Sequence, residues 1–291
     1  MEYSYATTSS PYMSYVYSNT TEVCSENNNK PGFIMDVMTI IIICISLPLT
    51  LVAIYAVYSL VQKDSAAPIY VINLLVSDLI QLCCMSIEMA QSKEDQIHEV
   101  FFHIYFFGVM ASVGFMVCVA LERYLVIAWP LWYHFRRTIK ICVGVCVVVW
   151  TLPFFYLIPV ILDVNFQVSL TIFAIFFLLP YPLFIFFLGG TLKALSAASR
   201  IPPDEKRRIV ALLVLVLLIY TLLFLPSIIW SLIKKTRNDR VFCYLSYTVI
   251  KFSPLADLFL YVFLRKGVVD KLLASLCCCR IDTNYNSRST I

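Results

Sequence analysis

Charged residues are scarce in this sequence. Asp, Glu, Lys and Arg make up only 14% of its 291 residues, whereas a soluble domain carries roughly a quarter. Five long stretches contain none of them: 37–62, 100–121, 141–162, 164–192 and 209–233. Each is as long as the roughly 20 residues with which a helix crosses about 30 Å of hydrocarbon. Because so little polar sequence remains to cover these stretches, the composition argues against the buried helices of a soluble protein.

Two further apolar stretches contain isolated charges, namely Asp78, Glu88, Lys251 and Asp257. The apolarity is continuous rather than alternating, which predicts helices, since membrane strands alternate in segments of about ten residues. The sequence therefore predicts an all-α membrane protein, a seven-transmembrane helix bundle. The expected spans are 33–61, 67–91, 98–128, 139–162, 166–192, 207–233 and 242–264.

The basic residues are distributed unevenly between the two sides of this bundle. With seven spans the loops alternate sides, and 14 of the 22 Lys and Arg residues fall opposite the N-terminus or in the C-terminal segment, against 6 on the N-terminal side. Cytoplasmic loops carry the excess of Lys and Arg, which predicts a multi-pass plasma-membrane protein with an extracellular N-terminus. The net charge of +4 reflects this bias and does not indicate nucleic-acid binding.

The two ends of the chain lie outside the expected bundle, which occupies 33–264. The N-terminal segment, 1–32, has no basic flank followed by an apolar core, so no cleaved signal peptide is expected. After the last span, the apolar spacing in 265–279 predicts a short amphipathic eighth helix along the membrane surface. A cytoplasmic tail follows at 280–291.

Several residues outside the spans are candidates for covalent modification. Asn19 begins an Asn-Thr-Thr glycosylation sequon on the expected outer side. Cys24 and Cys243 are the two cysteines placed on that side, where disulfides form, and we expect them to pair. The juxtamembrane cysteines on the cytoplasmic side are palmitoylation candidates, namely Cys277, Cys278 and Cys279.

Five short motifs follow one another in order along the expected spans. They are "NLLVSD" at 73–78, "ERY" at 122–124, Trp150 followed by Pro153, Pro226 in the sixth span, and "DLFLY" at 257–261. Together they resemble the rhodopsin-like (class A) family of G-protein-coupled receptors. Within that family, "IAWPLWYHFRR" and the short loops are most similar to the branch holding receptors for nucleotides, lipids, protons and peptides.

The sequence departs from the family pattern at several positions. Thr50 stands where the first helix usually has Asn, Phe224 where the sixth has Trp, and Leu258 where the seventh has Pro. Both cysteines of the usual extracellular disulfide are missing, one near His98 and one in the loop at 163–167. The cysteine pair expected above would then be the only outer disulfide.

Motifs of other membrane-protein classes are missing from the sequence. It contains no His-Glu-x-x-His, no Gly-x-Ser-x-Asp-like nucleophile arrangement and no paired catalytic aspartates, which argues against an enzyme. A transporter would show inverted repeats with broken helices near the midplane, and no internal symmetry is found. The short loops do not accommodate the re-entrant filter of an ion channel.

The resemblance implies a G-protein-coupling surface at the cytoplasmic end of the third helix. At rest Arg123 would pair with Glu122, and on activation it would be released to meet the G protein. Pro226 would be the bend at which the sixth helix swings outward. An Arg that merely anchors the helix end at the membrane surface is the alternative. The implied coupling residues are Glu122, Arg123, Tyr124, Leu131 and Tyr261.

Three polar residues of the spans match the positions that hold a sodium ion in this family, namely Asp78, Ser112 and Asp257. Charges inside a membrane are costly and are therefore functional candidates. Two carboxylates and a hydroxyl supply oxygen ligands for such an ion. Protonated carboxyl groups that share hydrogen bonds are the alternative, and both interpretations stay open.

Lys251 is the most unusual charged residue of the spans. It lies six positions before Asp257, the spacing at which the similar opsins carry their retinal-linked lysine. Retinal is disfavoured because Phe101 stands at the family's usual counterion position in the third helix. We expect Lys251 either to pair with Glu88, in the outer half of the second helix, or to bind the anionic head group of a ligand.

The expected outer pocket mixes aromatic rings with one acid and one base. Its residues are Glu88, His103, Phe106, Phe107, Tyr156 and Lys251. The sequence thus predicts a cell-surface receptor that binds an unidentified anionic small or lipid ligand and activates a heterotrimeric G protein. No cofactor other than sodium is expected, and membrane lipid is the surrounding partner. A proton-sensing or peptide receptor is one alternative, and a non-signalling or constitutively active binding protein is the other.

Overall fold

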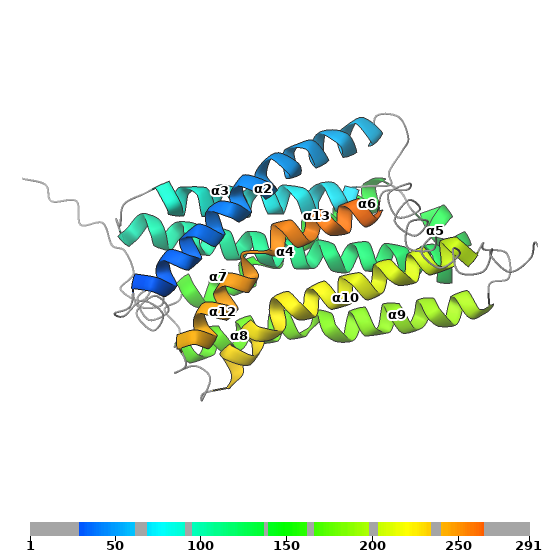
Figure 1. Cartoon of the computed structure of the whole chain (residues 1–291). Coiled ribbons are helices and arrows are strands. Elements are labelled where there is room, and N and C mark those ends of the chain that lie inside the picture. The colour runs from blue at the N-terminus through cyan, green and yellow to red at the C-terminus, as the bar shows by residue number, and fades with distance from the viewer. Residues whose placement is uncertain are drawn as a thin grey trace, which may run out of the picture.

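The computed structural model describes residues 29–61, 69–90, 95–136, 139–161, 166–197, 203–233 and 240–264 (Figure 1). Within these ranges the ordered elements are all helices. The expected modification residues Asn19 and Cys24, the three cysteines at 277–279 and the expected eighth helix at 265–279 lie outside the described residues.

Four spans are single long helices. They are α2 (Asn29–Val61), α3 (Ile69–Ala90), α4 (Asp95–Ala128) and α10 (Pro203–Leu232). Pro48 lies inside α2 and Pro226 inside α10, and neither ends its helix. In a membrane bundle, neighbouring helices and polar side chains satisfy the backbone groups that a proline leaves unpaired.

The other three spans each consist of two consecutive helices. The pairs are α6 (Ile139–Thr151) with α7 (Phe154–Ile161), α8 (Phe166–Leu178) with α9 (Pro180–Ala197), and α12 (Arg240–Ile250) with α13 (Ser253–Leu264). Pro153 and Pro180 lie at the first two breaks, because proline has no N–H and its ring clashes with the preceding turn. A short helix, α5 (Pro130–Arg136), follows α4.

The described helices are long and apolar enough to form a membrane bundle. The four long helices and the first two pairs give six stretches that are long and apolar enough to cross a membrane. The third pair, Phe242–Ile250 and Ser253–Phe263, is bent by 42° and makes a seventh span. This confirms the predicted all-α, seven-span architecture. Large apolar side chains such as Phe33, Val52 and Tyr55 on α2 face outward, as expected where lipid tails rather than water surround the protein.

Helix α4 runs through the middle of the bundle (Figure 1) and packs against α3, α6, α9 and α10. About it lie the largest fully buried rings of the described chain, including Tyr220, Phe177 and Phe224. The Tyr220 hydroxyl donates a 2.6 Å hydrogen bond to the carbonyl oxygen of Phe177. Phe224, which replaces the usual helix-six Trp, stacks on Phe177 with ring centroids 4.9 Å apart. These contacts join α10 to α8 just before the break at Pro180.

Candidate functional site

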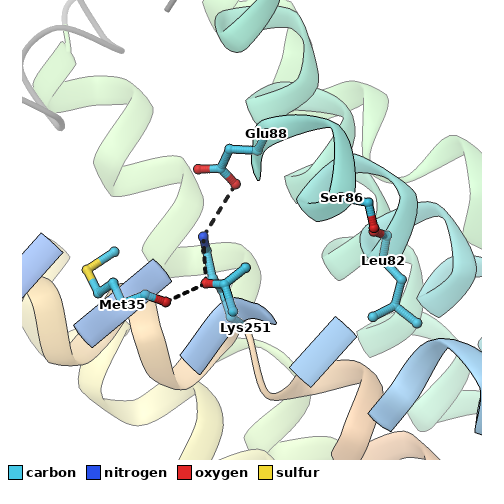
Figure 2. Close-up of polar contacts among 6 residues, drawn as sticks. Met35, Leu82, Ser86, Glu88 and Lys251 are labelled. Carbon is cyan, nitrogen blue, oxygen red and sulfur yellow. Dashed lines mark hydrogen bonds and ion pairs between the residues drawn. The ribbon is translucent and has the colours of Figure 1, made fainter. Parts of the chain in front are cut away.

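Lys251 lies at the bend between α12 and α13, where it joins three spans. Its ammonium Nζ is 3.3 Å from Glu88 Oε2 on α3 and 3.4 Å from Thr39 Oγ1 on α2 (Figure 2). The Thr39 hydroxyl in turn donates to the carbonyl oxygen of Met35 at 2.8 Å. The ring of Tyr247 lies 5.1 Å from Nζ, within the range of a cation–π interaction.

The two charges of this cluster differ in their access to the surroundings. The Lys251 side chain is 5% exposed, whereas that of Glu88 is 37% exposed. A buried charge requires a partner, because removing it from water is expensive. Glu88 is therefore the counterion of Lys251 and also the more accessible member of the pair.

Aromatic rings from three other helices, α7, α8 and α12, lie against the neighbouring part of α4. The Phe106 ring lies 6.4 Å from that of Tyr247 and 5.5 Å from that of Phe173. His103 is buried with its ring centroid 6.2 Å from that of Tyr156. Neither of its ring nitrogens has a hydrogen-bond partner among the described residues. Besides Glu88, the predicted pocket residue Phe106 thus lies beside the Lys251 cluster, through Tyr247.

Phe107, the remaining predicted pocket residue, lies on a different side of α4. Its ring stacks on Trp150 with centroids 6.0 Å apart, and the Trp150 Nε1–H donates to Asn73 Oδ1 at 3.0 Å. Phe107 therefore packs against α6, away from Lys251, and its surroundings are those of a packing residue. The Trp150–Asn73 bond joins two of the sequence motifs across the α3–α6 contact.

In the middle of the bundle, two buried carboxyl groups lie on α3 and α13. The Ser112 hydroxyl donates to Asp257 Oδ2 at 2.6 Å, and Asp78 and Asp257 are close enough to interact. Asp78 Oδ2 and Asp257 Oδ1 have no hydrogen-bond partner in the described part of the chain. Two adjacent buried carboxyl groups require a proton or a cation between them. The structure thus brings together the three predicted sodium-site residues.

The expected resting pair of Glu122 and Arg123 is not formed. Glu122 Oε1 instead accepts a 2.7 Å hydrogen bond from the Tyr133 hydroxyl on α5. Among the described side chains no ion pair joins Glu122 to Arg123, and Arg123 Nε is buried without a hydrogen-bond partner. The physical reason is that consecutive residues of a helix do not face each other. The prediction of this pair from the sequence is therefore wrong.

Tyr124 packs closely against α9. Its ring lies 5.8 Å from that of Phe187 and 5.7 Å from that of Phe186. A Cβ atom added to Gly190 would lie only 2.6 Å from Tyr124 Cε2. The absence of a side chain at position 190 is therefore what allows the Tyr124 ring to reach the backbone of α9.

The two remaining predicted coupling residues differ in exposure. Leu131 on α5 is 76% exposed, next to the exposed rings of Trp129 and Phe135. Tyr261 on α13 is partly buried against a small apolar cluster that includes Leu258. The expected coupling residues and the aromatic residues near Lys251 lie toward opposite ends of α4. Because α4 is one continuous helix, the two groups are separated by roughly 1.5 Å for each residue between them.

Three functional contacts were not anticipated from the sequence. Thr39 and Tyr247 complete the surroundings of Lys251, and Tyr133 holds Glu122. Tyr133 belongs to the "IAWPLWYHFRR" stretch and could have been found there. Thr39 and Tyr247 carry no sequence signal, because an uncharged hydroxyl in an apolar span has many alternative roles.

The described chain is a seven-span helical bundle with two buried carboxyl groups between its helices and an acidic-Arg-Tyr sequence near the end of α4. The sequence model of the "7 transmembrane receptor (rhodopsin family)" matches residues 49–169. Proteinase-activated receptor 2 of Rattus norvegicus is 25% identical over 291 aligned positions, covering 86% of this chain and 73% of the relative. G-protein coupled receptor 68 of Homo sapiens is 24% identical over 284 positions, covering 85% and 78%. The chain is thus similar to receptors of the rhodopsin-like family of G-protein-coupled receptors.

The relatives agree in the general class of protein. A further human relative, G-protein coupled receptor 183, is 22% identical over 263 positions and is covered over 73% of its length. These relatives support a multi-pass membrane receptor of the G-protein-coupled kind, and not an enzyme. The relatives include receptors of the branch that the inner motifs resemble.

Proposed function

We propose that this receptor responds to an anionic small molecule or lipid whose acidic group binds Lys251. The observation that carries the proposal is the pairing of a buried ammonium with a carboxylate that is partly exposed. An acidic ligand group could replace Glu88 and still satisfy the buried charge, whereas a neutral group could not. The aromatic rings of Phe102, Phe106 and Tyr247 beside Lys251 suit the apolar or ring-shaped remainder of such a ligand.

In this proposal the N-terminus is extracellular and the Lys251 cluster faces outward. The distribution of Lys and Arg supports this orientation. Cys243 is disulfide-bonded, which supports an outer disulfide with Cys24. Glycosylation at Asn19 belongs to the same side, and palmitoylation of the cysteines at 277–279 belongs to the cytoplasmic side.

The G protein would bind at the opposite end of the bundle. Arg123 supplies the charge for its C-terminal helix, and Leu131 supplies an exposed apolar contact. Pro226 is the bend about which α10 opens this end, while Tyr124 and Tyr261 pack the neighbouring helices. The roles of these residues rest on the family pattern, and the exposure of Leu131 supports its part.

A sodium ion fits the buried carboxyl pair. The unpartnered oxygens of Asp78 and Asp257 and the hydroxyl of Ser112 are hard ligands of the kind that alkali cations prefer. When bound, the ion would supply the positive charge that two adjacent carboxylates require. A shared proton is the alternative occupant.

The test uses membranes that contain the receptor and a G protein, with guanine-nucleotide exchange as the readout. Oleoyl lysophosphatidic acid and uridine diphosphate are the anionic probes, and monooleoylglycerol is the neutral control. We expect an active anionic probe to lose potency on the order of 30-fold in Lys251→Gln and to retain it in Lys251→Arg, since hydrogen bonds to charged groups have this strength. Equal potency in Lys251→Gln would contradict the proposal.

The same assay separates the alternatives. A response to an acidic pH step alone would favour a proton-sensing receptor, for which the buried His103 is the candidate. A response to an added proteinase would favour activation by a proteinase, as in the name of the rat relative, Proteinase-activated receptor 2. High exchange without any probe would indicate a constitutively active protein, and no exchange under any condition a non-signalling one. Glu88 is also a carboxylate beside Lys251, so retinal incubation followed by an absorption spectrum is a necessary control.

A further inference from the structure

The Lys251–Glu88 ion pair leaves hydrogen-bonding capacity unused on Lys251. An ammonium group has three N–H donors, and oxygen atoms accept two of them here, namely Glu88 Oε2 at 3.3 Å and Thr39 Oγ1 at 3.4 Å (Figure 2). The Thr39 hydroxyl donates its own hydrogen to the Met35 carbonyl, so Thr39 acts as an acceptor toward Lys251. One N–H of Lys251 therefore has no oxygen partner among the described residues.

Glu88 has even more capacity left. Within the described part of the chain, its only ion pair or hydrogen bond is the one that Oε2 makes with Lys251. An ionised carboxylate accepts hydrogen bonds through both of its oxygens, so Oε1 remains for another donor. The Glu88 side chain is also 37% exposed. A free acceptor thus lies beside a free donor, on two residues of opposite charge.

The pair carries no net charge, and this restricts the ligand that suits it. An acid that binds Lys251 alone brings a second negative charge beside Glu88, and like charges repel strongly where little water screens them. If the acid displaces Glu88, that carboxylate loses its ammonium partner. A ligand that carries both an acid and an ammonium group avoids both costs, because each of its charges meets an opposite charge of the receptor.

We propose that the ligand of this site is a zwitterion, whose acidic group binds the Lys251 ammonium and whose own ammonium binds the Glu88 carboxylate. The acid on Lys251 rests on the proposed function, and the ammonium on Glu88 extends it. Lysophospholipids with an ethanolamine head group and free aromatic amino acids both have this chemistry. Either apolar remainder suits the rings beside the pair, since the Tyr247 ring lies 5.1 Å from Nζ and stacks on Phe102 with centroids 6.2 Å apart.

One chemical change tests the ligand ammonium in the wild-type receptor. N-acetylation removes the positive charge of oleoyl lysophosphatidylethanolamine and of phenylalanine, and it leaves the acid in place. Each parent is compared with its N-acetyl derivative by guanine-nucleotide exchange and by the Tm of the purified receptor, which reports binding without signalling. We expect the active parent to be more potent than its derivative by about 10-fold or more, as for a hydrogen bond between charged groups. The parent that acts identifies the source as a lipid or an amino acid.

Variants of Glu88 test whether its carboxylate causes this advantage of the parent. The advantage should disappear in Glu88→Gln, which has no negative charge, and persist in Glu88→Asp, which keeps it. Lys251→Gln should weaken parent and derivative alike. Because Glu88→Gln leaves Lys251 without its counterion, the double variant with Lys251→Gln replaces it if too little reaches the surface. That variant lacks both charges, so parent and derivative should act equally weakly on it.

Several results would overturn the zwitterion. One is an N-acetyl derivative as potent as its parent in the wild-type receptor. Another is an advantage of the parent that is equally large in Glu88→Gln, and a third is no change of Tm or exchange with either parent. In each case, a response to oleoyl lysophosphatidic acid or uridine diphosphate that depends on Lys251 would leave the proposed function intact. Responses that do not depend on Lys251 would contradict the proposed function as well.

Discussion

The hydroxyl of Tyr133 donates a 2.7 Å hydrogen bond to Glu122 Oε1 and so ties α5 to the end of α4. Glu122 is buried, and Arg123, its neighbour in the sequence, turns to another side of the helix. At this end of the bundle the acidic residue of the "ERY" motif is therefore held by a loop helix. We expect this contact to favour the arrangement of α4 and α5 seen in the structure over a more open one.

Tyr133→Phe should raise basal G-protein activation. The change removes one hydrogen bond to a charged group and leaves the ring, so the resting arrangement loses on the order of 1 kcal/mol, or about 5-fold in its population relative to the active one. Basal guanine-nucleotide exchange per surface receptor measures this. Phe135→Leu, on the same helix but 80% exposed, is the matched control. Unchanged exchange in Tyr133→Phe would show that the bond does not restrain the receptor.

Arg123→Ala should remove G-protein activation while leaving the receptor at the cell surface. Arg123 Nε has no partner within the described chain, so its loss breaks no resting ion pair there. Guanine-nucleotide exchange, measured with and without an active anionic probe and normalised to surface receptor, shows the loss. Signalling of normal size in Arg123→Ala would mean that the residue only anchors the helix end.

The sequence was sufficient to place the membrane spans, because the thickness of the hydrocarbon layer sets their length. The last span was found although it contains Lys251 and Asp257, and its bounds of 242–264 agree closely with the helices from Phe242 to Phe263. Proline effects were less predictable. Pro153 interrupts the fourth span whereas Pro226 stays inside α10, because neighbours that satisfy the freed backbone groups are set by the tertiary packing.

The site was predictable only where charge restricted the choice of partner. Glu88 was the acid expected for Lys251, and the two lie 3.3 Å apart. Thr39 is separated from Lys251 by 212 positions, and no local pattern relates them. The pair of Glu122 and Arg123 failed for a local reason, since adjacency in a helix sequence separates side chains in space.

Gly190→Ala should disturb the coupling end, and Gly189→Ala should not. The new methyl group would lie 2.6 Å from the Tyr124 ring, whereas a Cβ at position 189 meets no atom within 4 Å. Overpacking of this kind costs about 1–3 kcal/mol, so Gly190→Ala should lower the Tm of the purified receptor and change its basal exchange. Both variants gain the same helix propensity, which makes Gly189→Ala a matched control. Equal Tm values for the two would contradict the packing of Tyr124 on α9.

Sodium should stabilise the receptor through Asp78 and Asp257. A ligand that binds only the folded state raises stability by RT ln(1 + [L]/Kd), or about 1.4 kcal/mol when its concentration is about ten times Kd. The Tm of the purified receptor should therefore be higher in sodium chloride than in choline chloride at the same ionic strength. Asp78→Asn should abolish this difference, because one of the two unpartnered carboxyl oxygens becomes an amide group. Ser77→Ala, at the neighbouring buried position whose hydroxyl bonds the Leu74 carbonyl, should keep it. A difference that is the same in wild type and Asp78→Asn, or missing from both, would favour a shared proton between the two carboxyl groups.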